Sequence, residues 1–318
     1  NKICFETSNI TTTIGIEYEA VLDTCIPLAH YYEGWNWISF NQSLSNMSID
    51  SVFTTIGDSP TYIKSQSEYS DYYSDFGWFG TLETIDNISM YKINMLNSDA
   101  IALRGEYINI DSTIFNLLSG WNWIGYSPAI SVNISTALSN IPDNYATYIK
   151  SQSEYADYYS DFGWFGTLET MNPLSGYLIN LNDSTNFTYN DDMNINRRLN
   201  ISNTIETNNI HGLNIYDYEH NGSITATISN ENYDDYILLA FNENECIGVA
   251  ESKIFPINGN IVHLLMVYSN TTSSPINLKA FHKPSNIYLD IKKTFTFTPD
   301  MRLGSAHEPI ILNIDEKL

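Results

Sequence analysis

The stretch from Thr61 to Thr84, TYIKSQSEYSDYYSDFGWFGTLET, decides the organisation of the chain because it is present twice. The second copy runs from Thr147 to Thr170 and differs only in that Ser70 is replaced by Ala156. Residue 61 corresponds to residue 147, so the period is 86 residues. A repeat of this length is typical of a small domain rather than of one turn of a solenoid. We therefore expect two tandem modules, each with its own core.

A second motif, GWNWI, recurs with the same period at Gly34–Ile38 and Gly120–Ile124. In an extended chain Trp35 and Trp37 point to one side, while Ile38 and Phe40 point to the other, which predicts a central strand covered on both faces. Apolar residues at spacings of three and four predict a short helix later in each copy. The expected elements are a strand at 34–40, a helix at 47–56 (134–141 in the second copy), a strand at 61–66, a turn or short helix at 68–76 and a strand at 78–82.

The remainder of the chain has a different pattern. Residues 181–209 are rich in Asn, Asp, Ser and Thr and are typical of a linker. After them come about seven short apolar runs with polar turns, which predict an immunoglobulin-like β-sandwich. The expected fold is mostly β, with two tandem small α+β repeat modules followed by that sandwich. The expected units are 1–33 (tail of a preceding repeat or N-terminal strand segment), 34–118 (repeat module 1), 119–204 (repeat module 2) and 205–318 (C-terminal β-sandwich).

Charge and hydropathy limit the classes of function. The chain has 318 residues, with 14 Lys and Arg against 37 Asp and Glu, so its formal net charge is −23. Nucleic-acid binding depends on basic side chains that neutralise phosphates, so nucleic acid is not an expected partner. No apolar run approaches the roughly 18–20 residues of a membrane-spanning helix, so we expect no membrane span.

Two sets of motifs carry a resemblance to known modules. One is GWNWIS followed by YIKSQ and GWFGTL; the other is LAFNENECIGVA at residues 239–250. The chain resembles modules of large secreted, multi-module surface proteins of aquatic bacteria and of large viruses. The resemblance covers most of residues 34–314 and implies extracellular display with assembly or adhesion. It also implies a hairpin in the C-terminal module, in which an Ala-Phe strand and a Cys-x-Gly-Val-Ala strand flank a two-residue acidic turn.

Signals of catalysis are weak. None of the six histidines lies in the duplicated blocks, and the sequence has no G-x-S-x-G, phosphate-loop, dinucleotide or H-E-x-x-H motif. We therefore expect a non-enzymatic protein. A polysaccharide-active enzyme is the third and least favoured interpretation.

Three carboxylates of the repeated block are the candidate metal ligands. They recur at spacings of three and four, which would place them on one face of a helix. Such a cluster could hold Ca²⁺ as a cofactor or supply a glycosidase with its acid and nucleophile; a solvated acidic face is the favoured alternative. Lys64 and Lys150 are the only basic residues nearby, so a counter-ion has to come from elsewhere. The candidate ligands are Glu68, Asp71, Asp75, Glu154, Asp157 and Asp161.

The aromatic residues of the same block suggest a sugar site. Trp78 and Phe79 are neighbours in an expected strand, so one ring should face the core while the other can be exposed. An exposed ring beside polar side chains could stack on a sugar, although ordinary packing of all these rings is the alternative. The candidate ligand-binding residues are Gln66, Tyr72, Tyr73, Trp78, Gln152, Tyr158, Tyr159 and Trp164.

Cysteines and glycosylation motifs complete the set of candidate modification sites. We expect Cys4 to pair with Cys25 and Cys246 to be a buried apolar residue, although three reduced thiols are also compatible with the sequence. Ten N-x-[ST] motifs are candidate glycosylation sites if the chain passes through a glycosylating secretory pathway. They lie at Asn9, Asn41, Asn46, Asn87, Asn133, Asn182, Asn186, Asn200, Asn221 and Asn270.

The sequence thus predicts an acidic structural protein on a cell or virion surface, a subunit of a fibre, filament or appendage. Its partners would be copies of itself or other surface-protein modules. The alternative is an adhesin arm that binds glycans through two equivalent weak sites, with affinity raised by multivalency.

Overall fold

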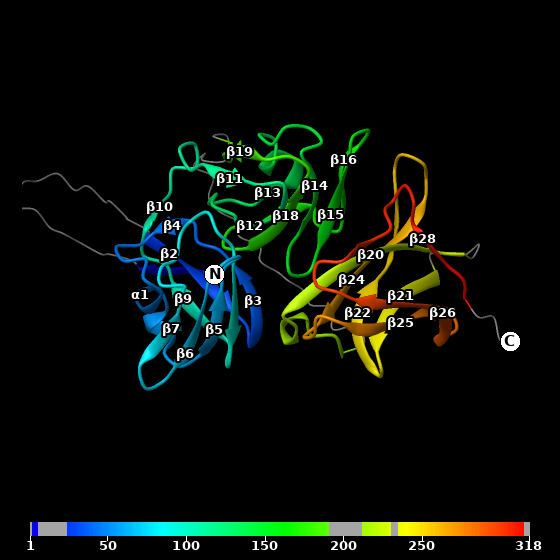
Figure 1. Cartoon of the computed structure of the whole chain (residues 1–318), viewed down its shortest axis with the longest axis horizontal. Helices are drawn as coiled ribbons and strands as arrows, with labels where there is room; N and C mark the ends of the chain where they lie inside the picture. The colour runs from blue at the N-terminus through cyan, green and yellow to red at the C-terminus, as the bar shows by residue number, and fades with distance from the viewer. Residues whose placement is uncertain (1, 6–23, 191–211, 230–234, 315–318) are drawn as a thin grey trace, which may run out of the picture.

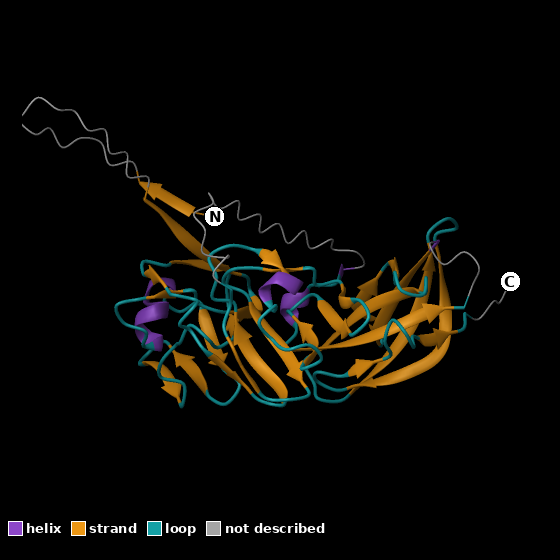
Figure 2. Ribbon diagram, turned by 90° about the horizontal axis from the view of Figure 1, so that it is seen from above, coloured by secondary structure: helices purple, strands orange, loops and turns teal. Residues whose placement is uncertain are grey.

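The computed structural model describes residues 2–5, 24–190, 212–229 and 235–314. With 52% strand and 7% helix the fold is mostly β, and it consists of repeated antiparallel sheets. Module 1 and a C-terminal unit lie at the two ends of the molecule, and module 2 lies between and above them in the view of Figure 1. Figure 2 shows how little helix the chain contains, confined to short turns beside the strands.

Module 1 is built on a five-stranded antiparallel sheet with the order β3-β8-β5-β6-β7. Helix α1 (Ile49–Phe53) and the 3-10 turn η1 (Thr54–Ile56) cover one face of this sheet, where Val52 and Phe53 are buried. Ser48 begins α1 and accepts a hydrogen bond from the Ser51 amide, as an N-cap residue should. The strands are β3 (Gly34–Ile38), β5 (Pro60–Lys64), β6 (Tyr69–Tyr73), β7 (Gly77–Gly80) and β8 (Tyr91–Met95).

Module 2 repeats this arrangement with the order β12-β18-β14-β15-β16. Its helix α2 (Ile134–Ala137) is shorter than the expected 134–141 and is capped by Asn133. The buried side chains of module 2 form a cluster distinct from that of module 1, so each module has its own core as expected. The strands are β12 (Gly120–Gly125), β14 (Ala146–Lys150), β15 (Tyr155–Tyr159), β16 (Gly163–Gly166) and β18 (Gly176–Leu181).

Small satellite sheets follow the same period. In module 1, β2 (Thr24–Tyr31) pairs with β9 (Asp99–Ala102), opposing Ala29 to Ile101; in module 2, β11 (Phe115–Leu117) pairs with β19 (Thr185–Phe187), opposing Phe115 to Phe187. Residues 24–31, which the sequence placed in a separate N-terminal segment, therefore pair with a strand of module 1. Strand β1 (Lys2–Phe5) pairs with β2 in a register that sets Cys4 opposite Cys25. The shortest pairs are β4 (Gln42–Ser43) with β10 (Glu106–Tyr107) and β13 (Val132–Asn133) with β17 (Thr170–Met171).

Two expectations within the repeat were wrong. The GWNW strand β3 is an edge strand rather than a central one, because β8 lies between it and β5. Residues 68–76 contain strand β6 rather than a helix, and they form an antiparallel hairpin with β7. Alternation of side chains in β6 therefore replaces the helical spacing on which the carboxylate cluster depended.

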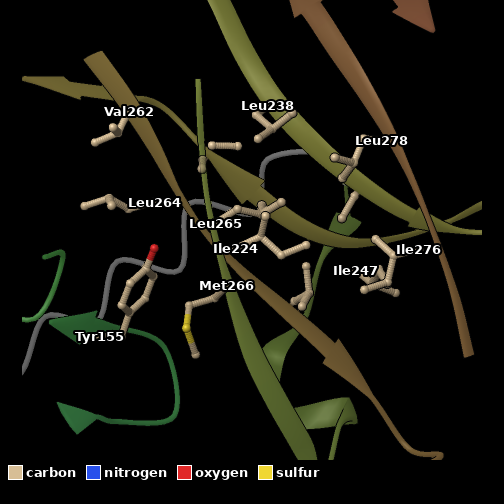
Figure 3. Close-up of a cluster of buried hydrophobic side chains, with 14 of the residues drawn as sticks. Tyr155, Ile224, Leu238, Ile247, Val262, Leu264, Leu265, Met266, Ile276 and Leu278 are labelled. Atoms are coloured by element: carbon tan, nitrogen blue, oxygen red, sulfur yellow. The ribbon is translucent and has the colours of Figure 1, made fainter. Parts of the chain in front are cut away.

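The C-terminal unit contains two sheets whose facing side chains, among them Ile224, Leu265, Leu238 and Leu278, form one core (Figure 3). One sheet has the order β23-β24-β20-β27 with β28 also beside β20, and the other has the order β22-β21-β25-β26. The hairpin expected from the LAFNENECIGVA motif is present as β21 and β22, and Cys246 is buried. The elements are η4 (Ile215–Asp217), β20 (His220–Ile228), β21 (Tyr236–Asn242), β22 (Glu245–Ala250), β23 (Ser252–Ile254), β24 (Ile261–Ser269), β25 (Ser274–His282), β26 (Ile287–Phe297), β27 (Arg302–Leu303) and β28 (Ile310–Leu312).

The two modules close each other's exposed sheet edges through a repeated glutamine. Gln152 of module 2 accepts from the Trp37 amide at 3.1 Å and donates to the Trp35 carbonyl at 2.7 Å, both on edge strand β3. Gln66 of module 1 makes the reciprocal pair of bonds with the Trp123 amide and the Trp121 carbonyl, each at 2.9 Å. Because unpaired edge groups invite unwanted strand pairing, this exchange protects both edges. The modules are thus related by an approximate two-fold axis.

Indole rings and lysines fill the space near this axis. Trp37, Met90 and Leu178 are buried there, with the rings of Trp121 and Trp123 packed against them. The Lys92 ammonium lies 4.3 Å from the Trp37 ring centre and 4.9 Å from that of Trp123, a cation–π arrangement. Burial lowers the pKa of Lys92 to about 7.

Removing one of the bridging glutamines tests this interface. We expect Gln152→Ala to lower the free energy of unfolding by about 2 kcal/mol, because the buried edge of β3 loses a donor and an acceptor together. Gln66→Ala is the matched variant and should cost about 1 kcal/mol, since Gln66 is exposed and water can replace its amide. Urea unfolding of both variants measures the two losses, and changes below about 0.5 kcal/mol in both would contradict the role of the glutamines.

Candidate interaction surface

The repeated block folds into a hairpin that presents one set of side chains on the outer face of each sheet. The register sets Tyr62 and Phe79 on either side of Asp71, and alternation along β6 adds Tyr69 and Tyr73 to the same face. We define the module 1 hairpin face as Tyr62, Lys64, Tyr69, Asp71, Tyr73 and Phe79, with Phe76 from the following turn. The module 2 hairpin face is the equivalent set Tyr148, Lys150, Tyr155, Asp157, Tyr159 and Phe165, with Phe162.

The opposite side of each hairpin faces the core of its own module. In module 1 the Ser70 hydroxyl donates to the Leu82 carbonyl at 2.7 Å, and the Trp78 ring lies 5.7 Å from that of Phe53. Ser70 is the position that becomes Ala156 in the second copy. The one difference between the blocks is therefore internal, and the two hairpin faces carry identical residues.

These identical faces are covered to very different extents. Tyr69 and Phe79 of module 1 are 49% and 69% exposed, whereas their equivalents Tyr155 and Phe165 are 0% and 7% exposed. The module 2 rings belong to the hydrophobic cluster of the C-terminal unit. Figure 3 shows Tyr155 beside Leu264 and Met266 of β24. The C-terminal unit thus covers the face of module 2 except at Phe162, which is 43% exposed.

Hydroxyl groups fix the position of the C-terminal unit on module 2. The Tyr148 hydroxyl donates to the Ser223 hydroxyl at 2.9 Å, and those of Tyr155 and Thr225 are 2.8 Å apart. Farther along, the Ala306 amide donates to the Tyr159 hydroxyl at 2.7 Å. Burial raises the pKa of Tyr148 and Tyr155 above the ordinary value, so both hydroxyls keep their protons.

The Phe255 ring of the C-terminal unit is inserted among the aromatic side chains of the module 2 hairpin face, and the His307 ring lies beside it. The Phe255 ring is 4.9 Å from that of Tyr159, 4.8 Å from that of Phe165 and 6.0 Å from that of Phe162. It is completely buried. Tilted and edge-to-face contacts at these separations are favourable beyond the area that they bury.

Charged groups complete this contact. The Arg302 guanidinium lies 2.5 Å from an Asp157 carboxylate oxygen and 5.1 Å from the Tyr148 ring centre. Burial raises the pKa of Asp157 to about 6, and Arg302 acts in the opposite direction. Lys150 is completely buried and donates to Asp300 at 2.6 Å and to the Asn221 side chain at 2.6 Å. Arg302 of the C-terminal unit thus supplies the counter-ion that Asp157 lacks within the repeated block.

Within the part of the chain that the structure describes, the module 1 face meets the C-terminal unit at its inner end. Lys64 forms an ion pair with Glu219, and the Tyr32 ring, in the loop before β3, lies 4.5 Å from that of Tyr216. At the outer end Phe76 stacks on Tyr73 with ring centres 4.8 Å apart. Phe76 is 65% exposed, so this end of the face is open to solvent.

The structure distributes the proposed sugar-binding residues over three places. Tyr72 and Trp78 lie together on the core side, 5.2 Å apart, and Tyr158 and Trp164 repeat this pair at 5.3 Å. Tyr73 lies on the module 1 hairpin face, Tyr159 is buried under the C-terminal unit, and Gln66 and Gln152 bridge the modules. The most exposed ring is that of Phe79 rather than that of Trp78.

The proposed metal ligands are also dispersed. Asp71 and Asp157 lie on strands, whereas Glu68 and Asp75 with their equivalents Glu154 and Asp161 lie in the turns on either side. Asp157 faces Arg302, and Asp161 lies 3.5 Å from His307. Among the residues that the structure describes, no histidine, cysteine and carboxylate side chains come together in a group of three that could hold a metal ion.

Two of the candidate glycosylation sites are buried. Asn41 and Asn221 are 3% and 2% exposed, and their side-chain nitrogens donate to backbone carbonyls. A glycan on either one is incompatible with the folded chain. Asn9 and Asn200 lie outside the described residues. The exposed or half-buried candidates are Asn46, Asn87, Asn133, Asn182, Asn186 and Asn270.

The groups that cover module 2 were not predicted from the sequence. Phe255, Asp300 and Arg302 belong to the C-terminal unit and lie in no motif. One feature of the sequence pointed to them: the repeated block is acidic and contains no arginine, so its carboxylates need a basic partner from elsewhere in the chain.

Comparison with known proteins found no match among protein-family models, curated proteins or solved structures. Within the described parts of the chain, no helix has the length and apolar character needed to cross a bilayer.

The two faces allow a matched test of the ion pair. We expect Asp157→Ala to lower the free energy of unfolding by about 2 kcal/mol. This is less than the ~3–5 kcal/mol typical of a fully buried pair, because Arg302 reaches solvent. Asp71→Ala removes the same side chain from the open copy and should change stability by less than about 0.5 kcal/mol. Thermal or urea unfolding gives both values; equal losses would show that Asp157 does not depend on the C-terminal unit.

Proposed function

We propose that the chain is a non-enzymatic structural protein of a cell or virion surface, a subunit of a fibre, filament or appendage. In this proposal the module 1 hairpin face joins the chain to a neighbouring protein. One observation supports it above all: in module 2 the same residues already bind a protein surface, that of the C-terminal unit. The resemblance of the chain's motifs to those of secreted surface modules favours the extracellular location.

We further propose that the C-terminal unit is an immunoglobulin-like sandwich. Taking β20 as strand B, β21 to β26 follow as C, C′, D, E, F and G. The sheet orders β23-β24-β20 and β22-β21-β25-β26 then correspond to D-E-B and C′-C-F-G of that fold. The place of strand A beside B is taken by β27 and β28, which run parallel to β20.

Rigid joints between the units suit a structural role. Gln66 and Gln152 fasten module 1 to module 2, and buried Lys150 fastens module 2 to the C-terminal unit. The second joint buries the Lys150 ammonium, whose partners are supplied across it, so partial separation leaves that charge unsatisfied. A chain joined in this way resists bending between its units.

Glycan binding is the second candidate, favoured by the open rings of Tyr73, Phe76 and Phe79 beside carboxylates. A planar apolar surface with polar neighbours suits the C–H face and hydroxyl rim of a sugar. Because the C-terminal unit covers the equivalent rings of module 2, this candidate now implies one open site per chain rather than two.

Sedimentation velocity and electron microscopy of the full chain, from micromolar to millimolar concentration, test the proposal. We expect ordered oligomers or filaments that are lost in Phe79→Asp, a substitution that places a carboxylate on the open face. A monomer at every concentration would overturn the structural role. Retention on a glycan array that is lost in Phe79→Ala would favour the adhesin instead.

A further inference from the structure

The chain contains two identical docking faces and one C-terminal unit. Every side chain through which module 2 contacts that unit is present in module 1 at a position 86 residues earlier. Tyr62, Tyr69 and Tyr73 correspond to the three tyrosines of module 2 whose hydroxyls are hydrogen-bonded to the C-terminal unit. Asp71 corresponds to Asp157, the partner of Arg302. The open face therefore has the complete set of groups that recognise the C-terminal unit.

The geometry of the open face matches that of the covered one. In module 1 the rings of Tyr62 and Tyr69 stack at 6.0 Å with planes 22° apart. The covered equivalents, Tyr148 and Tyr155, stack at 5.6 Å with planes 25° apart. These rings need no rearrangement to bind. At the outer end, Phe76 rests on Tyr73, and the equivalent tyrosine of module 2 instead has Phe255 against it.

We propose that the module 1 hairpin face is a docking site for the C-terminal unit of a second copy of this chain, bound through the contacts that module 2 makes with its own. The inference rests on the proposed function and names the neighbour in the assembly. Phe255 of the second copy would enter between Tyr73 and Phe79, and its Arg302 would pair with Asp71. The contact is heterologous, so repeating it builds a closed ring where the rotation between copies closes and an open filament where it does not.

Charge favours this occupant over a second module 1 face. The chain has a formal net charge of −23, and pairing two open faces would bring carboxylates such as Asp71 and its copy together. The C-terminal unit instead carries the basic residues Arg302 and Lys253. Lys253 donates to the Gly166 carbonyl and to the Glu169 carboxylate of module 2. The equivalents Gly80 and Glu83 are exposed in module 1.

The closed chain limits this docking. Lys64 is already paired with Glu219 of the chain's own C-terminal unit. Its equivalent in module 2, Lys150, binds Asn221 and Asp300, so an incoming unit would need a free Lys64 to bind its own Asn221 and Asp300. Phe255 and Arg302 of the incoming unit are in turn held by module 2 of its own copy, so complete docking requires that each C-terminal unit first leave its own chain. A tethered unit competes at an effective concentration on the order of 1 mM, so the wild-type chain should assemble only near that concentration.

Releasing the resident unit tests the proposal with the full chain. In the double variant Asp157→Arg with Phe165→Asp, the module 2 face repels Arg302 and loses its ring contact with Phe255. We expect sedimentation velocity to show concentration-dependent assembly shifted at least about 100-fold below the wild-type range, since the competing tether is lost. Adding Asp71→Arg and Phe79→Asp applies the matched changes to module 1 and should restore the monomer. Assembly that persists in the quadruple variant would overturn the proposal.

Disulfide trapping covers the case in which the double variant does not fold. Cys4, Cys25 and Cys246 are first replaced, and Phe165→Cys with Phe255→Cys within one chain serves as the positive control. A chain with Phe79→Cys is then mixed at about 1 mM with a chain carrying Phe255→Cys, a concentration near the tethered one. We expect a cross-linked dimer of the two, and its absence beside a successful control would overturn the proposal. Assembly of the wild type without this cross-link would leave the structural role intact and refute only the docking site.

Discussion

The burial of one aromatic hairpin face under the C-terminal unit determines the character of the whole molecule. Tyr155 and Phe165 are removed from water with an aspartate between them, and this is tolerable only because Arg302 and the hydroxyls of Ser223 and Thr225 satisfy the polar groups. The chain makes this face twice and covers it once. The consequence is an exposed copy, on module 1, of a surface whose binding partner is already visible elsewhere in the same molecule.

The approximate two-fold arrangement of the modules explains why the face is duplicated as a whole. Gln66 and Gln152 belong to the repeated block and also seal the edge strands that carry the tryptophan motif of the opposite module. One block therefore has two duties, an edge contact with its sister module and a face contact with the C-terminal unit. Both copies make the edge contact, but only module 2 makes the face contact. The edge contact therefore stabilises the pair of modules, whereas the module 1 face is left free for a partner.

Much of the local structure followed from the residues, and the arrangement did not. The period of 86 and the hairpin at LAFNENECIGVA were visible because motifs and turn residues are local signals. Strand β3 was misplaced because its partner β8, centred on Ile93, lies far along the chain and lacks a motif. Glu68, Asp71 and Asp75 imitated helical spacing, although the alternation of Tyr69, Asp71 and Tyr73 is the pattern of a strand. The unequal exposure of the two faces could not be predicted, since Phe255 and Arg302 are remote in sequence from the rings and carboxylates that they meet.

Tyrosine nitration of the dilute native chain, followed by peptide mass spectrometry, tests the central claim most directly, because Ser70 and Ala156 distinguish the two copies. Tyr72 and Tyr158 are an internal control, since each is half-buried with its hydroxyl bonded to an aspartate, Asp58 or Asp143. The account predicts similar nitration of this pair, together with rapid nitration of Tyr69 and Tyr73 and protection of Tyr155 and Tyr159. Equal nitration of the two hairpin faces would contradict it.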